Sequence, residues 1–307
     1  MKYFHDFVLI ESYVQLRTFF FYVDSMQVNI NKTTFIIRFN GIVRNDNQIK
    51  KLLKEREIND YISFLVRRNI RSDLVLMIFK CIYFISNKSF TKKRFFIGDY
   101  YSKWMKIITK TYFFSDLYYL DDGLASISAY KSICINTRKV NLITEFNLES
   151  NDICKVIKLC RVKIKKETDE NKCLIIGMPM IEHQAFVNTN LYMEYLIKIK
   201  NKFKNHEISY APHRYENIDN IKIIGSLGFN ILNIDMSIED YIEKNDKVPL
   251  HVVSLYSSAL IYINSFYDGV KVYYFYLNCS DISEKFRGNA MLSYEYMKTK
   301  TNIEQVE

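Results

Sequence analysis

The chain has 307 residues, of which 49% are hydrophobic and 25% charged, and it carries a formal net charge of +9. This composition excludes a disordered chain and allows a large hydrophobic core, and the length favours two domains. The positive charge suits an anionic partner such as nucleic acid, anionic lipid or a sugar nucleotide, and does not choose among them.

The six cysteines form no CxxC pair and no cluster with histidine at metal-ligand spacing. We therefore expect mostly buried free thiols in a reducing cytoplasm, and no metal site. The N-terminus carries Asp6 and Glu11 where a signal peptide would be apolar. The longest apolar segment, residues 74–85, is too short to span a bilayer and contains Lys80. We expect a soluble protein that can adhere to a membrane surface.

The first half of the sequence alternates apolar strands with helices, as in a parallel sheet with crossover helices. Strands are predicted at 7–12, 33–41, 93–97 and 111–120, and helices at 13–26, 47–68 and 103–110. The segment 71–86 mixes strand and helix signals, and a turn is predicted at Gly98-Asp99. The residues between 137 and 172 are largely polar, and we place the domain boundary within them, around Lys165 to Lys172.

The second half restarts the same alternation after that boundary. Strands are predicted at the starts of 173–179, 207–217, 228–245, 248–266 and 270–278, and helices at 188–205, 258–266 and from Ile282 onward, with a short helix near 238–245. The prediction is therefore an α/β protein with an N-terminal domain of residues 1–165 and a C-terminal domain of residues 166–307, whose final helix can pack back on the first domain. Pro179, Pro212 and Pro249 each fall at a predicted strand end or start, where a sheet tolerates proline.

Two adjacent carboxylates, Asp121 and Asp122, follow a buried strand in the sequence YLDDG. At the carboxyl end of a parallel strand, one of them can act as a general base on a hydroxyl, and Gly123 permits a sharp turn. The structural interpretation is an Asx turn that closes the strand.

The sequence YAPHRYE places His213 and Arg214 on a loop after another strand, and such a pair suits a phosphate. Ser257 and Ser258 stand where a strand gives way to a helix, which is either a plain N-cap or an anion site built on the helix N-terminus. Both motifs also have a purely structural interpretation.

Two single residues add weaker signals. Glu239 either caps a helix or accepts hydrogen bonds from a ribose, and Gly177 either serves a turn or lets a ligand approach the backbone. The sequence has neither GxGxxG nor GxxxxGK[ST], which excludes the nicotinamide-type fingerprint and the P-loop.

In order and spacing, these motifs resemble those of the bacterial sialyltransferases. The group includes lipooligosaccharide sialyltransferases and capsular polysialyltransferases, which share a D/E-D/E-G motif, an HP or HR-type motif and a late Ser-Ser or Ser-Thr motif. The stretches VLIESYVQL, FFIGDYYSKWM and VPLHVVSLYSSAL also resemble the group, so that the likeness runs from Phe7 to about Tyr267. The sequence departs from the pattern where Pro212 precedes and Arg214 follows the histidine, and where SYVQL lacks a proline after the serine.

The resemblance implies a GT-B architecture, in which two Rossmann-like domains face each other across a cleft. It implies inverting, metal-independent transfer of sialic acid from CMP-sialic acid to a glycan hydroxyl, with the donor bound mainly by the C-terminal domain. Asp122 would be the base, with Asp121 as the alternative, and His213 would protonate or hydrogen-bond the departing phosphate.

The remaining candidates would bind the donor. Ser257 and Ser258 would hold phosphate oxygens, Glu239 the ribose and the backbone of Gly177 the nucleotide, while Arg214 would pair with the phosphate or the sialic acid carboxylate.

The acceptor implied is a lipooligosaccharide or capsular polysaccharide, and the location is the inner face of the cytoplasmic membrane, with peripheral attachment to an anionic surface. Two alternatives stay open: a GT-B glycosyltransferase for another nucleotide sugar, and a basic nucleic-acid-binding protein. The second makes no use of the DDG, PHR and SS motifs and would favour a denser basic patch, so nucleic acid is not the partner we expect.

Overall fold

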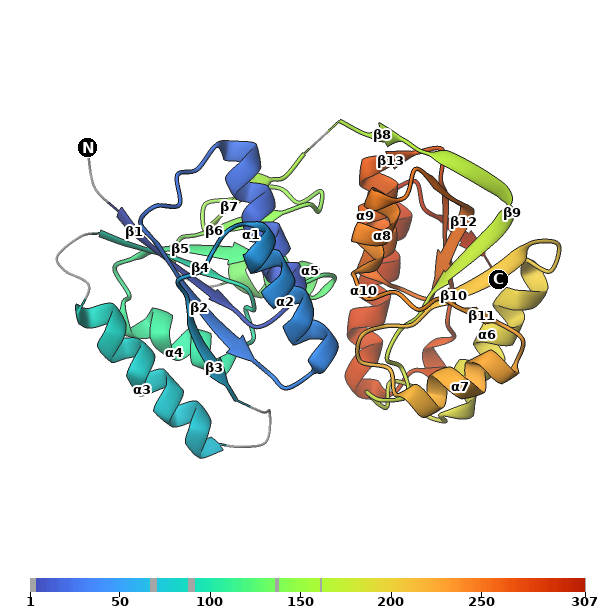
Figure 1. Ribbon diagram of the computed structural model, residues 1–307, viewed down its shortest axis with the longest axis horizontal. Helices are drawn as coiled ribbons and strands as arrows, with labels where there is room; N and C mark the ends of the chain where they lie inside the picture. Colours follow the sequence, from blue (N-terminus) through green and yellow to red (C-terminus); the bar gives the residue numbers. More distant parts are fainter. Residues whose placement is uncertain (1–3, 67–70, 88–91, 136–137, 161, 307) are drawn as a thin grey trace. The chain divides into compact units, whose positions relative to one another are not determined.

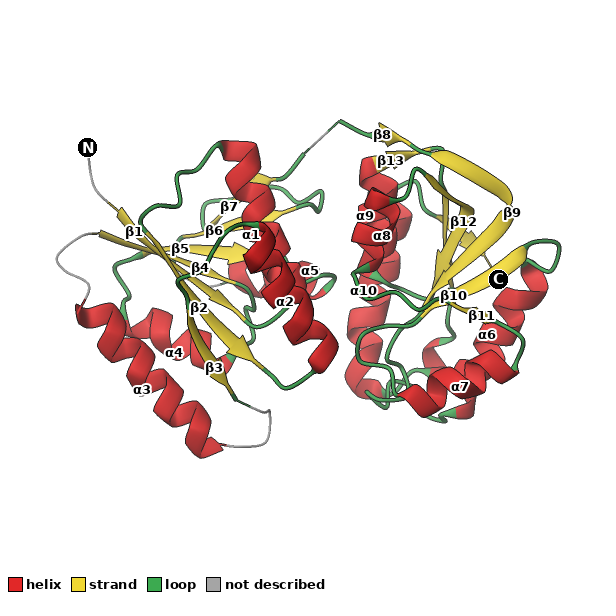
Figure 2. Ribbon diagram, in the orientation of Figure 1, coloured by secondary structure: helices red, strands yellow, loops and turns green. Residues whose placement is uncertain are grey.

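The computed structural model describes residues 4–66, 71–87, 92–135, 138–160 and 162–306, without the side chains of residues 71 and 72. The chain divides into two compact units, Met1–Cys160 (unit 1) and Arg161–Glu307 (unit 2). Each unit alternates strands and helices around a parallel sheet, as predicted (Figures 1 and 2).

Unit 1 is built on a seven-stranded parallel sheet with the order β3-β2-β1-β4-β5-β6-β7. Its strands are β1 (Phe4–Ile10), β2 (Thr33–Phe39), β3 (Ile62–Leu65), β4 (Lys92–Ile97), β5 (Asp116–Leu120), β6 (Val140–Thr144) and β7 (Cys154–Lys158). The second halves of the central strands β1 and β4 are apolar because both of their faces are buried there. In β1, for example, Phe7 and Val8 point to opposite faces and are both fully buried.

Helices cover both faces of this sheet (Figure 1). Residues of α1 (Tyr13–Met26) and α2 (Val43–Glu55) share one core cluster with one side of the strands. Residues of α3 (Arg71–Asn87), α4 (Lys103–Thr111) and α5 (Ala125–Cys134) share a second cluster on the other side.

Unit 2 is built on a six-stranded parallel sheet with the order β11-β10-β9-β12-β14-β15. Its strands are β9 (Glu167–Ile176), β10 (Glu207–Ala211), β11 (Asn230–Ile231), β12 (Lys247–Ser254), β14 (Lys271–Phe275) and β15 (Glu304–Val306), beside the small pair β8 (Ile164–Lys165) and β13 (Tyr267–Asp268). Its helices are α6 (Asn190–Lys202), α7 (Ile218–Ser226), α8 (Ile238–Lys244), α9 (Ser258–Phe266) and α10 (Glu284–Lys300), with one turn of 3-10 helix at Cys279–Asp281.

The helix predicted at 47–68 is wrong in its second half. The helix α2 ends at Glu55, where Glu57 adopts a positive φ of 57°, and the edge strand β3 follows. The left-handed conformation stops the helix, and "ISFL" then pairs with β2. The ambiguous segment 71–86 is helical, as α3.

Several short helices and strands were not predicted from the sequence. The strands β6 and β7 lie in the stretch taken as polar, and the helices α5 and α7 and the strand β15 were not expected. Strand β7 is at the sheet edge and only Cys154 in it is buried, so its sequence lacks the apolar run that marks a central strand. Pro249 lies inside β12 rather than at its end, where the register shifts between Pro249 and His251.

The six cysteines are free thiols, of which Cys81, Cys154 and Cys173 are buried and Cys160 and Cys279 are exposed. Among the described residues, no helix has the length and apolar character needed to cross a membrane.

Candidate functional site

The paired aspartates lie where β5 ends at the carboxyl edge of the unit 1 sheet. Gly123, directly after them, has a φ of +66°, a conformation that disfavours other residues, so the glycine makes the turn possible. The backbone N–H of Asp122 donates to Ser126 Oγ at 2.9 Å, which anchors the turn to the first turn of α5. The two carboxylates therefore leave the strand in fixed and different directions.

The carboxylate of Asp122 is held by the N-terminus of α1. Ser12 is the N-cap of this helix and donates from Oγ to Asp122 Oδ1 at 3.1 Å. The same Oγ accepts from the Gln15 N–H at 3.4 Å, and Gln15 Oε1 accepts from the Ser12 N–H at 3.2 Å, which completes a capping box. The stretch VLIESYVQL thus positions the acid of the DDG motif.

A third stretch packs on the same place. A Cβ on Gly98 would overlap the side-chain amide of Gln15, so only glycine fits after β4 while the capping box is intact. Beside it, Glu11 Oε2 accepts from Trp104 Nε1 at 2.9 Å and from Arg38 Nη1 at 2.8 Å. The ends of β1 and β5 are therefore joined by the hydrogen bond from Ser12 to Asp122, and the end of β4 packs on the Gln15 side chain.

Asp99 and Asp122 line one small pocket at this edge, together with residues from the loop after β4 and from β5, β6 and α5. Burial and then the negative charge of Asp122 raise the pKa of the Asp99 carboxyl to about 7, although the Tyr101 N–H, 2.7 Å from Oδ1, favours the charged form. The pocket thus places a partly exposed carboxylate next to an acid that titrates near neutral pH.

Asp121, by contrast, turns into the protein and is only 4% exposed. Its Oδ2 accepts from the Glu145 N–H at 2.7 Å, which ties the ends of β5 and β6. Burial and then the Glu145 charge raise the pKa of Asp121 to about 7. The Glu145 carboxylate is itself 3.6 Å from Arg17 of α1. Asp122 is thus the aspartate of the pair that reaches a pocket.

In unit 2, three of the predicted motifs meet at the carboxyl edge of neighbouring strands. Strand β9 ends before Gly177, β10 ends before Pro212 and His213, and β12 ends shortly before Ser257. The three strands are adjacent in the order β10-β9-β12. In a parallel sheet this is the edge where ligands bind.

The ring of His213 is held in one orientation by its own loop. Its Nδ1 accepts from the Tyr215 N–H at 3.2 Å, and its ring stacks on that of Tyr215 with centroids 5.3 Å apart. Because Nδ1 accepts, the neutral ring carries its proton on Nε2. His213 can therefore donate a hydrogen bond from Nε2.

A buried chain of hydrogen bonds fixes this loop beneath Gly177. Glu216 accepts from the His213 N–H through Oε2 and from the Tyr210 hydroxyl through Oε1, both at 2.5 Å. The Tyr210 hydroxyl also bonds the Tyr192 hydroxyl at 2.7 Å, and the latter accepts from the Met178 N–H at 3.0 Å. A Cβ on Gly177 would lie 2.5 Å from the Tyr210 hydroxyl oxygen and closer still to Glu216. The space beside Gly177 is thus filled by the protein's own side chains.

The serines stand at the start of α9. Ser257 is its N-cap, with Oγ accepting from the Ala259 N–H at 3.3 Å, and both Ser257 and Ser258 are partly exposed. Glu239 is 8% exposed in the first turn of α8, which packs against α9. The Tyr262 hydroxyl of α9 donates to Glu243 Oε2 of α8 at 3.3 Å. Ser258 lies one turn before Tyr262, and Glu239 lies one turn before Glu243. Ser258 and Glu239 are therefore at the same end of the two packed helices, on the carboxyl edge of the sheet.

Arg214 stands beside His213 with its guanidinium over the Tyr215 ring, 5.3 Å from the centroid. It makes no ion pair with any residue that the structure describes, and its Nε is buried without a hydrogen-bond partner. Arg214 is therefore a partly buried positive charge without a carboxylate partner in the described part of unit 2.

The structure thus brings Gly177, His213, Arg214, Ser257, Ser258 and Glu239 to one edge of unit 2, and places Asp121 and Asp122 at the equivalent edge of unit 1. Sequence reasoning missed Ser12, Gln15, Asp99 and Glu216 as supports of these motifs. The capping-box spacing S-x-x-Q was a readable signal for the first two. Within the described ranges, no three His, Cys, Asp or Glu side chains are arranged to hold a metal ion.

No protein-family model and no curated protein matches this sequence. The chain is similar in structure to three solved proteins. A 2,6-sialyltransferase from a Photobacterium species, in a ternary complex with the donor product CMP and the acceptor substrate lactose, has a TM-score of 0.55 and 13% identity over 98% of this chain and 78% of that one. MurG from Acinetobacter baumannii has a TM-score of 0.48 and 7% identity over 98% and 85%. A glycosyltransferase from Rickettsia africae has a TM-score of 0.42 and 12% identity over 97% and 92%.

At such identities the likeness to the Photobacterium enzyme defines the fold. Two parallel α/β units in one chain, seven-stranded and six-stranded, give the GT-B class, as the sequence predicted.

Asp121→Asn should change how stability depends on pH. An unfolded aspartate has a pKa of about 3.9, so the folded protein, with a pKa near 7 here, binds more protons between these values. The free energy of unfolding of the wild type should therefore fall as pH rises from about 4 to about 7, by up to about 4 kcal/mol from this group. Asp121→Asn has no titrating carboxyl at this position, so its free energy of unfolding should lack this part of the fall. Urea unfolding followed by fluorescence of Trp104, the single tryptophan and buried in unit 1, measures it.

The matched control is Asp116→Asn, an exposed aspartate on the same strand, which should keep the wild-type pH dependence. Parallel pH curves for the wild type and Asp121→Asn would contradict the raised pKa.

Gly177→Ala should destabilise unit 2 by about 1–3 kcal/mol, because the new methyl group displaces Tyr210 and Glu216 from their hydrogen bonds. Gly288→Ala is the control, since its Cβ would meet no atom within 4 Å in the exposed part of α10, and it should stabilise by about 0.5–1 kcal/mol. Scanning calorimetry measures the melting temperatures of both variants and of the wild type. A melting temperature of Gly177→Ala equal to that of the wild type would contradict the packing around Gly177.

Proposed function

We propose that this protein is an inverting glycosyltransferase that transfers sialic acid from CMP-sialic acid to a hydroxyl of a glycan acceptor. The observation that carries the proposal is the chemistry at the two carboxyl edges. One edge holds a partly exposed carboxylate, Asp122, fixed by Ser12, and the other gathers a histidine donor, an arginine and a helix N-terminus. The GT-B fold and the order of the DDG, PHR and SS motifs support it.

Asp122 is the proposed general base. The acceptor oxygen attacks the anomeric carbon of the sialic acid and passes its proton to the Asp122 carboxylate. The hydrogen bond from Ser12 orients this carboxylate, and an ionised carboxylate has several lone pairs that can accept a proton from the acceptor hydroxyl. Asp121 then has a positioning role, because its buried Oδ2 holds the Glu145 N–H.

The proposed donor site takes up the charge of the leaving group. As the bond between the anomeric carbon and the phosphate oxygen breaks, its electron pair leaves with CMP. His213 donates from Nε2 to that oxygen, while the hydroxyl of Ser258 and the N-terminus of α9 at Ser257 bind the other phosphate oxygens. Displacement in one step inverts the anomeric configuration.

Three further residues have proposed binding roles. The low exposure of Glu239 and its place beside α9 suit a carboxylate that accepts from ribose hydroxyls. Arg214 supplies a positive charge for the phosphate or the sialic acid carboxylate. The backbone of Gly177 is the proposed contact to the nucleotide, because this residue follows β9 at the carboxyl edge of the sheet.

The proposed acceptor is a lipooligosaccharide or capsular polysaccharide at the inner face of the cytoplasmic membrane. Donor and acceptor of this class are anionic, which agrees with the net charge of +9. The protein would attach to this anionic surface peripherally.

Incubation of the wild type with CMP-sialic acid and a panel of galactosides and sialosides should release CMP. Asp122→Asn should lose about 10²- to 10⁴-fold in rate, because the proton of the acceptor then has no base. Asp116→Asn, the exposed aspartate at the other end of the same strand, should keep the wild-type rate.

Donor specificity is tested in the same assay with UDP- and GDP-sugars in place of CMP-sialic acid. Release of UDP or GDP without release of CMP would make the protein a transferase for another nucleotide sugar. No release from any donor would reduce the proposal to a fold assignment.

Chelation should leave this activity intact, because hydrogen-bond donors and Arg214 take the place of a cation at the phosphate. We expect the same rate of CMP release with and without EDTA. Loss of activity in EDTA with recovery on Mn²⁺ addition is the result that would refute this part of the mechanism.

A further inference from the structure

Helix α3 carries large apolar side chains on its exposed side as well as on its buried side, which is unusual for a helix on a protein surface. One side packs into the core of unit 1 through Met77, Ile78, Cys81 and Ile85. The other side exposes Val75, Leu76, Phe79 and Tyr83, at 51%, 55%, 67% and 72% of their surface. Large side chains at positions i, i+4 and i+8 form a continuous stripe, so this exposure is not a set of scattered residues.

Helix α4 packs beside α3 on the same side of the sheet, away from α1 and α2 (Figure 1). Its outward positions are Lys103, Ile107 and Lys110, all exposed. We call the exposed side chains Val75, Leu76, Phe79, Lys80, Tyr83, Lys103, Ile107 and Lys110 the α3–α4 face. It joins an apolar stripe to a row of lysines.

The charge around this stripe is mainly positive. Among the described side chains of the two helices, Lys80, Lys103, Lys106 and Lys110 stand against a single acid, Asp73. A partner with a negatively charged surface is therefore favoured over a neutral or basic one.

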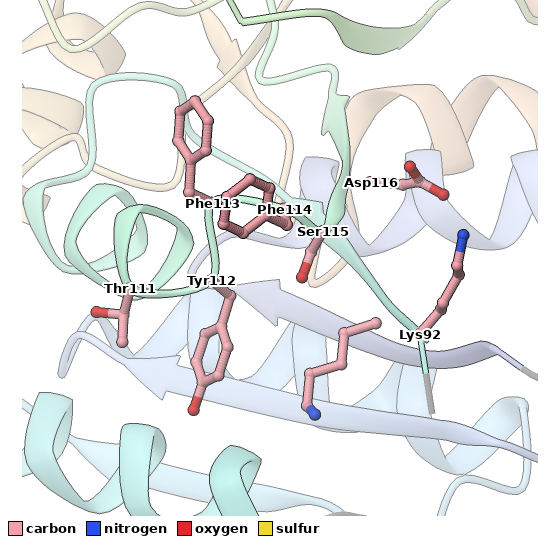
Figure 3. A pocket seen from close by; sticks show the side chains of 8 residues that line it. Lys92, Thr111, Tyr112, Phe113, Phe114, Ser115 and Asp116 are labelled. Atoms are coloured by element: carbon pink, nitrogen blue, oxygen red, sulfur yellow. The ribbon is translucent and has the colours of Figure 1, made fainter. Parts of the chain in front are cut away.

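The surface continues past the C-terminal end of α3. The Tyr112 hydroxyl donates to Ile82 O at 2.9 Å and bonds Ser86 Oγ at 2.7 Å, which fastens the loop after α4 to the end of α3. The next two residues, Phe113 and Phe114, are 56% and 100% exposed. This loop borders a pocket of about 340 Å³, which Lys92 and Lys93 line from β4 (Figure 3). Exposed aromatic rings and lysines thus occur together at this end as well.

We propose that the α3–α4 face docks on the surface of an anionic lipid bilayer. Apolar side chains on a convex helix, flanked by lysines, fit the boundary between headgroups and acyl chains, where the stripe is buried and the lysines meet anionic headgroups. Helix α3, with 17 residues and Lys80 at its middle, lies along this boundary rather than across the bilayer. The proposal rests on the membrane-located function proposed above, which it deepens by naming the contact surface.

The test is co-sedimentation of the full chain with vesicles of phosphatidylcholine alone and of phosphatidylcholine mixed with phosphatidylglycerol. The wild type should bind the anionic vesicles, and more weakly at high salt. The double variant Leu76→Ser with Phe79→Ser should bind at least about tenfold more weakly. The control, Val43→Ser with Ile218→Ser, removes two similarly exposed apolar side chains on α2 and α7 and should bind as the wild type does.

A second pair of variants tests the charges. Lys80→Gln with Lys110→Gln should weaken binding to the anionic vesicles, whereas Lys298→Gln with Lys300→Gln, two exposed lysines of α10, should not. Fluorescence of Trp104 reports that each variant of unit 1 is folded.

Three results would overturn the proposal: no binding of the wild type to anionic vesicles, equal loss in test and control variants, or a change from dimer to monomer in the Leu76→Ser, Phe79→Ser variant. The last result would make the face an interface between two copies. CMP release with a soluble acceptor is measured separately, so a failed activity and a failed docking surface are distinguishable.

Discussion

The hydrogen bond from Ser12 to Asp122 is the interaction on which the first carboxyl edge depends. Ser12 begins α1, so its hydroxyl is fixed by the capping box at the same time as it holds the carboxylate. The Gln15 side chain that completes the box lies on Gly98 and leaves no room for a larger residue. The N-terminus of α1 thus fixes the position of the proposed base. It also determines how closely the chain after β4 can pack against the chain after β1.

Unit 2 uses a different device for the same purpose. A single carboxylate, Glu216, binds the backbone of His213 and the hydroxyl of Tyr210, and both contacts require the absence of a side chain at Gly177. The loop that carries His213 is therefore rigid without any contact to a ligand. A preorganised donor of this kind is what stabilisation of a leaving phosphate requires.

The alternation of strands and helices could be predicted because the central strands are buried on both faces. Runs such as FVLI, FFI and CLII have no polar residue and read directly as strands. The edge strand β3 was misassigned and β7 was missed because β3 has no fully buried residue and β7 has only one. Short amphipathic elements like these carry too little hydrophobic pattern to identify alone.

The residues of the candidate site could be predicted from motifs in the sequence, but the contacts among them could not. The sequence placed Asp121 and Asp122 at a strand end. The residue that binds Asp121, Glu145, directly follows β6, a strand that was not predicted. Likewise, the interpretation of Gly177 as a point of ligand approach did not include Tyr210 and Glu216, which fill the space beside it. Contacts between residues far apart in the chain decide these points.

Calorimetric titration of CMP into the protein tests most directly which residues bind the donor and which acts as the base. The account predicts that the wild type binds CMP in preference to UMP and GMP, that His213→Ala and Arg214→Ala weaken binding, and that Asp122→Asn leaves it unchanged. CMP binding that is lost in Asp122→Asn but kept in His213→Ala, or no preference for CMP, would contradict it.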